Sequence, residues 1–84
     1  MDNLALYAAF KAYTEGEAIF TRRMAIGIAD FFGTTPRRVI QHLERLWILK
    51  EGSWDWFVVN GGFTREHFDQ ARGVTNVAKD ADHG

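Results

Sequence analysis

Two pairs of arginines occupy positions where their charge could bind an anion. Arg22–Arg23 follows Thr21, and Arg37–Arg38 comes shortly after Thr35. Threonine is a preferred cap at the start of a helix, so each pair is expected in a first helical turn. Such a helix end carries partial positive charge and favours acidic residues, so four cations there are unfavourable for folding alone. Together with free backbone N–H groups they predict an anion site, and nucleic-acid phosphate is the anion we expect.

The arginines belong to a chain of 84 residues that predicts one small domain. Its hydrophobic share of 46% and aromatic share of 14% favour a packed globule. We expect a folded domain over residues 1–73 and a loose polar tail over 74–84. The chain has no cysteine, which excludes disulfides and thiolate zinc sites and fits a reducing, cytoplasmic setting. No segment reads as a secretory signal or is long enough to span a membrane, so we expect no membrane partner.

Positive charge is concentrated in one part of the chain. Residues 21–50 hold six basic residues against Asp30 and Glu44, a net charge of +4, whereas the remainder carries −5. This distribution favours docking of one substructure on a polyanion. The alternative is chance segregation, because surface helices carry charges of both signs.

The first predicted helix, Leu4–Thr14, is capped by Asp2 or Asn3 and is apolar on more than one side. A second copy of the chain could cover one of these sides. A homodimer is therefore predicted, and the candidate interface residues on this helix are Leu6, Phe10 and Tyr13.

The next two predicted helices are Arg22–Phe32, ending at Gly33, and 36–47, starting with Pro36 after the cap Thr35. Helical spacing puts one side of helix 36–47 in the core. That side comprises Val39, Ile40, Leu43, Leu46 and Trp47. The opposite side carries arginine and glutamine, which can contact phosphates and base edges in a major groove. Its members are Arg37, Arg38, Gln41, Glu44 and Arg45.

Two strands, Ile48–Lys50 and Trp54–Val59, are predicted as a compact hairpin around residues 51–53. Trp54 and Trp56 would then share one face of the second strand, either in the core or on a partner surface. A last helix, Arg65–Arg72, follows the cap Thr64, with Phe63 and Phe68 spaced as a hydrophobic staple.

This order of elements resembles the winged helix-turn-helix domain of bacterial and phage DNA-binding regulators, over residues 18–72. The run Ile28–Gly33 looks like the family's second helix and turn, and Thr35–Leu46 looks like its recognition helix. The strand Trp54–Val59 is similar to the wing. The resemblance implies a mainly α fold with a small β-hairpin (α+β): a three-helix core, a short wing and a C-terminal helix. The predicted wing departs from the family, because residues 52–63 contain no Lys or Arg.

The function expected from these residues and this resemblance is duplex DNA binding by a small transcriptional regulator, of a cell, phage or mobile element. The candidate DNA contacts are Arg22, Arg23, Thr35, Arg37, Arg38, Gln41 and Arg45. The alternative is a winged-helix protein-interaction module, such as an adaptor or a phage-encoded inhibitor of a nucleic-acid enzyme, with Trp54 and Trp56 at its interface. His42, His67 and His83 lack metal-ligand spacing, and no catalytic set of side chains is recognisable. No enzyme activity, cofactor or metal is therefore expected.

Overall fold

The computed structural model describes residues 1–73, and the regular elements in this part of the chain are all helices, with no strand. The elements are α1 (Asn3–Thr14), α2 (Arg22–Phe32), α3 (Pro36–Arg45), α4 (Ser53–Val59) and α5 (Arg65–Arg72). The expected α+β winged fold is wrong, because α4 stands where the second strand of the hairpin was predicted. The predicted tail 74–84, with His83, lies outside the described residues.

The local signals for helix starts are confirmed at four of these helices. The side chains of Asp2, Thr21, Thr35 and Thr64 each accept a hydrogen bond from the backbone N–H three residues onward. Gly33 ends α2 with φ 69°, a left-handed conformation that glycine adopts without steric cost. Phe63 and Phe68 also meet as predicted, with ring centroids 6.4 Å apart. Helix α3 is shorter than expected and ends at Arg45.

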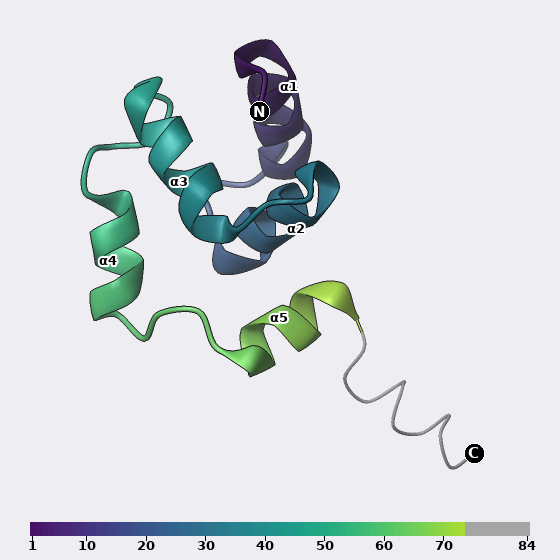
Figure 1. The fold of residues 1–84 in the computed structure, drawn as a ribbon, viewed down its shortest axis with the longest axis vertical. Helices are drawn as coiled ribbons and strands as arrows, with labels where there is room; N and C mark the ends of the chain where they lie inside the picture. Colours follow the sequence, from purple (N-terminus) through teal and green to yellow (C-terminus); the bar gives the residue numbers. More distant parts are fainter. Residues whose placement is uncertain (74–84) are drawn as a thin grey trace.

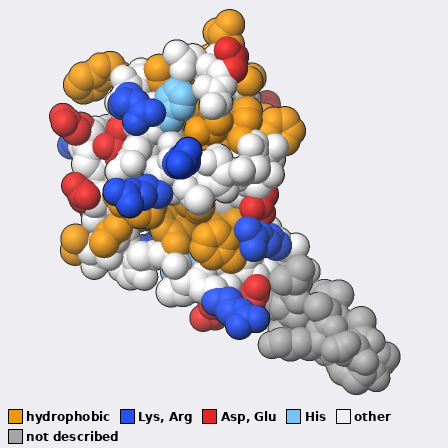
Figure 2. Space-filling model, viewed as in Figure 1, with side chains coloured by type: hydrophobic (Ala, Val, Ile, Leu, Met, Phe, Trp, Pro, Cys, Tyr) orange, Lys and Arg blue, Asp and Glu red, His pale blue; other side chains and the backbone are white. Residues whose placement is uncertain are grey.

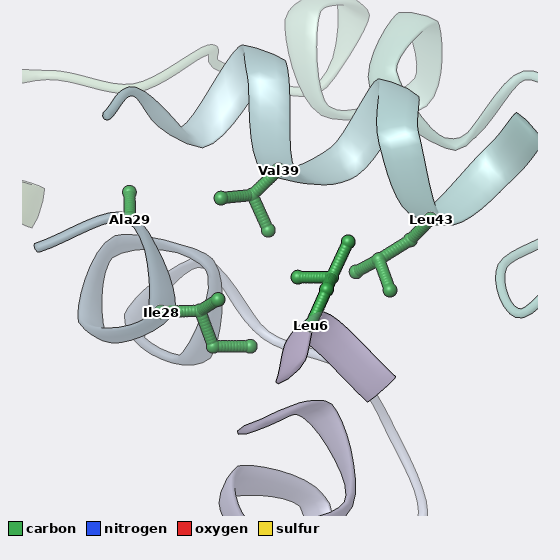
Figure 3. Packing of buried hydrophobic residues seen from close by; sticks show 5 residues of the cluster. All are labelled: Leu6, Ile28, Ala29, Val39 and Leu43. Atoms are coloured by element: carbon green, nitrogen blue, oxygen red, sulfur yellow. The ribbon is translucent and has the colours of Figure 1, made fainter. Parts of the chain in front are cut away.

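Helices α1, α2 and α3 pack together around one core, and α4 and α5 continue around its side (Figure 1). Val39 and Leu43 of α3 point towards Ile28 of α2 and Leu6 of α1 (Figure 3). All four side chains are fully buried. The expectation that Leu6 serves a protein interface is therefore corrected, because its side chain fills this core.

The other α1 residues expected at an interface also face the molecule in part. The half-buried Phe10 ring stacks on Phe20, with centroids 5.6 Å apart. Tyr13 lies against Gly27 of α2, where an added Cβ would come within 2.5 Å of the tyrosine ring. Tyr13 nevertheless stays 41% exposed, and Leu4 and Tyr7 on α1 are exposed as well.

Helix α4 is capped at both ends by charged side chains from other helices. The Glu44 carboxylate of α3 accepts hydrogen bonds from the backbone N–H of Gly52 (3.2 Å) and Trp54 (2.8 Å). At the other end, the Arg22 guanidinium of α2 donates to the carbonyls of Phe57 (3.2 Å), Asn60 (2.7 Å) and Gly62 (2.7 Å). Negative charge at the N-terminus and positive charge at the C-terminus both match the helix dipole.

These caps explain why residues with high strand propensity form a helix. A helix of seven residues is too short to be stable alone. Here it gains both caps and buries Phe57 against Ala25 and Ile40. Tertiary contacts therefore override the strand pattern of Trp54–Val59, the reason that the hairpin prediction fails.

The change from strand to helix also separates the two tryptophans that were expected on one face. Residues two apart in a helix point in different directions. Trp54 is half-buried and stacks on Phe63, with centroids 5.5 Å apart and ring planes 14° apart. Trp56 is 58% exposed. Trp47 was expected in the core, yet it is 79% exposed, because α3 ends two residues before it.

Candidate nucleic-acid interface

The side of α3 opposite the core carries a stripe of three long polar side chains: the exposed Arg37 and Arg45 and, between them, the half-buried Gln41. They are spaced four residues apart, which places them on one face of a helix. Val39, Ile40 and Leu43 on the other side are completely buried, and this fixes the rotation of α3 about its axis. The stripe is therefore presented outward by the same packing that forms the core.

The arginines of this face have no partner among residues 1–73. The side chains of Arg37, Arg38 and Arg45 are exposed, and none takes part in a hydrogen bond or salt bridge within that range. Lysine and arginine side chains are spaced along the face over α3, next to an apolar patch near α4 and α5 (Figure 2). Thr35 uses its hydroxyl oxygen to accept from the Arg38 N–H at 3.3 Å, which leaves the hydroxyl proton available to a ligand.

A groove of about 650 Å³ runs beside the first turn of α3. Arg37, Arg38 and Gln41 line one side, and aromatic rings from the α4–α5 region line the other. These rings belong to Trp54, Phe63 and Phe68. The sequence indicated Phe63 and Phe68 only as a helix staple, so their place beside the arginines was missed. The combination of cations and flat apolar surface suits a phosphodiester backbone, which offers both phosphates and sugars.

The arginine pair of α2 lies in a different environment. Arg22 is held by three backbone carbonyls, and its guanidinium also lies 5.1 Å from the Phe57 ring centroid. Arg23 is exposed and borders a separate hollow of about 680 Å³ that includes Tyr13 and His67. This hollow shares no lining residue with the groove beside α3. The structure therefore does not unite the two pairs in one site, and Arg22 has a role within the fold.

Three titratable groups near these helices are perturbed. Burial, followed by the charges of Arg45 and the N-terminus, lowers the pKa of His42 below its usual value. The His42 ring lies 2.7 Å from the Asn3 side-chain oxygen, which ties α3 to the start of α1. Hydrogen bonds from Arg72 at 2.9 Å lower the pKa of Asp30, and the same contact raises that of Arg72. This exposed pair joins α2 to α5.

The two acidic residues of segment 21–50 are thus both engaged within the molecule, Asp30 with Arg72 and Glu44 with the N-terminus of α4. Within residues 1–73, neither carboxylate forms a hydrogen bond or salt bridge with Arg37, Arg38 or Arg45. Hence these arginines keep their positive charge available for a ligand.

Residues 1–73 contain no group of three His, Asp or Glu side chains that could hold a metal ion. None of the described helices has the length and hydropathy to cross a membrane. Comparison with protein-family models, curated proteins and solved structures finds no match to this chain. The homodimer and the cytoplasmic location stay predictions.

Proposed function

We propose that the protein binds duplex DNA through the exposed face of α3 and acts as a small regulator of transcription. The observation that carries the proposal is the outward stripe Arg37–Gln41–Arg45, which has no partner within residues 1–73 and lies opposite a fully buried helix side.

The dimensions of α3 suit a major groove. A helix with its side chains is about 10–12 Å across, and the major groove is about 12 Å wide and admits one helix. Helix α2 precedes α3 across a turn at Gly33 and packs against it, as a supporting helix does in helix-turn-helix proteins. The α3 face would therefore enter the groove while α2 supports it from the opposite side.

The individual side chains would serve different parts of the DNA. Arg37 and Arg38, at the first turn, would neutralise backbone phosphates, and Thr35 could donate a hydrogen bond to one of them. Gln41 can pair bidentately with adenine and Arg45 with guanine, so these two side chains would read base edges. Arg23 is exposed at the start of α2 and would supply an additional phosphate contact.

Fluorescence anisotropy with a labelled random-sequence duplex, measured over a range of salt concentrations, tests the proposal. The double variant Arg37→Ala/Arg38→Ala should keep its circular dichroism spectrum and lose binding at low salt. If residual binding is measurable, the slope of log K against log salt should fall by about 1.8, because two phosphate contacts at about 0.9 each are removed. An unchanged affinity and slope in this variant would contradict the proposal.

A matched control removes the same charge elsewhere. Lys11 and Arg65 are exposed on α1 and α5, and neither lines the groove beside α3. The variant Lys11→Ala/Arg65→Ala should bind nearly as well as the wild type. Equal losses in both double variants would indicate attraction by overall charge and not a site on α3.

A second candidate function, binding of a protein partner, is favoured by an apolar hollow of about 220 Å³ next to α4. Ile19 and Trp56 border it and are largely exposed. Under this function, Trp56→Ala would abolish partner capture while the Arg37→Ala/Arg38→Ala variant kept it, the reverse of what DNA binding predicts.

A further inference from the structure

The turn that closes α3, two residues after the helix ends at Arg45, places a tryptophan in the left-handed conformation. Trp47 has φ 60° and is the one non-glycine residue of residues 1–73 with positive φ. Its N–H donates to Glu44 O at 2.9 Å, and the N–H of Ile48 donates to Leu43 O at 2.9 Å. These two bonds form the same closing motif that Gly33 gives to α2. A bulky side chain is strained there, because its Cβ crowds the following carbonyl oxygen.

Packing within the described chain does not offset this strain. The Trp47 side chain is 79% exposed. Across residues 1–73 its ring stacks on no other aromatic ring, and its indole N–H donates no hydrogen bond. A glycine at this position would close the helix with less strain and without exposing a large apolar ring. Strain retained without local benefit is a feature of residues that contact a ligand.

The ring lies at the end of the proposed DNA-binding stripe. Trp47 borders a hollow of about 510 Å³ together with Gln41 and Arg45, and Gln41 also lines the groove beside Arg37. Two carboxylates, those of Glu44 and Glu51, complete the hollow. The Glu44 carboxylate accepts hydrogen bonds from the backbone at the start of α4. The Glu51 carboxylate would repel a phosphate on its side of the hollow.

We propose that Trp47 is a DNA contact at the C-terminal end of α3, with its ring against a deoxyribose and its N–H donating to a phosphate. This inference rests on the proposed function. The neighbouring Arg45 supplies the cation at this end, and Trp47 supplies apolar surface and a neutral donor. The contact is independent of base sequence and would hold α3 in its register along the groove.

The experiment compares Trp47→Gly with the wild type in two measurements. Thermal unfolding should give a Tm higher by about 4 °C or more, because the strain at φ 60° is removed. Affinity for a labelled random-sequence duplex should fall about tenfold, as for loss of an aromatic contact residue. The salt slope should stay unchanged, because no charge is lost. Arg45→Ala is the matched contrast, and its slope should drop by about 0.9.

The variant Trp47→Phe separates the ring from the backbone conformation. It keeps an aromatic ring at the strained position and loses only the indole N–H donor, so its affinity should lie between those of the wild type and Trp47→Gly, without the rise in Tm. A higher Tm of Trp47→Gly with unchanged DNA affinity would refute the Trp47 contact, point to a protein partner for the ring and leave DNA binding by the arginines intact. A lower Tm would show that the ring packs within the chain and would also overturn the inference. Absence of wild-type binding to the duplex would refute the proposed function and this inference together.

Discussion

The starts of α2 and α3 have similar sequences, but their arginine side chains have different surroundings. Both begin with a threonine cap followed by two arginines, Arg22–Arg23 in α2 and Arg37–Arg38 in α3. The Arg22 guanidinium donates hydrogen bonds to three backbone carbonyls at and beyond the end of α4. The side chains of Arg37 and Arg38 form no hydrogen bond or salt bridge within the described chain. The motif alone does not decide between a structural and a binding arginine. What decides is whether another helix ends beside it.

The largest expected effect comes from removing the structural arginine. Arg22→Ala should lower the free energy of unfolding by about 2–3 kcal/mol, because two charge-assisted hydrogen bonds in partly buried surroundings, to the carbonyls of Phe57 and Gly62, are lost. The matched change Arg37→Ala should stay within about 0.5 kcal/mol of the wild type, as expected for an exposed site. Urea denaturation followed by circular dichroism measures both. Equal effects of the two substitutions would remove the distinction between the two helix starts.

A smaller effect is expected at the opposite end of α4. Glu44→Ala should cost about 1–2 kcal/mol, because the N–H groups of Gly52 and Trp54 lose their acceptor. The exposed Glu51 provides the control, and Glu51→Ala should change stability by less than about 0.5 kcal/mol. The same denaturation assay applies. Similar values for the two variants would mean that Glu44 does not hold α4, and that Arg22 acts alone in doing so.

The smallest effect concerns pH and is specific to the α3 region. The pKa of His42 is lowered in the folded state, so the unfolded chain takes up a proton more readily. This contribution to stability is present above the usual value of 6.5 and is lost as the pH falls below it. Tm should therefore decrease on going from pH ~7.5 to ~5.5, and His42→Gln should reduce this decrease. If Tm decreases by the same amount in His42→Gln, other titratable side chains cause the pH dependence.

Local signals predicted most helix boundaries and much of the candidate site. The caps Thr21, Thr35 and Thr64 and the stop Gly33 act on neighbouring backbone groups, so the printed sequence reveals them. The exposed positions of Arg37 and Arg38 followed from the buried spacing on the other side of α3. The arginine side of the groove was therefore foreseeable, whereas its aromatic side was not.

The two wrong predictions, a strand at Trp54–Val59 and a buried Trp47, failed because local signals were overridden. The segment Trp54–Val59 has the residue types of a strand, and it forms a helix because Glu44 and Arg22 cap it and Phe57 is buried. Trp47 continued the apolar spacing of α3, but the helix closes at Arg45, and the turn directs the ring outward. Contacts from other helices overrode the strand signal of Trp54–Val59, whereas the local closing turn of α3 overrode the apolar spacing at Trp47.

By itself, the sequence determined four helix starts and the buried side of α3, because caps and helical periodicity operate over a few residues. Only the tertiary structure decided that α4 is a helix and that Arg22 belongs to the fold. The Arg22 hydrogen bonds join residues 35 to 40 positions apart, and the Glu44 hydrogen bonds that also cap α4 join residues 8 and 10 positions apart. No local sequence pattern predicts these long-range hydrogen bonds, because they form only once packing of α1, α2 and α3 has placed the start of α2 beside the end of α4.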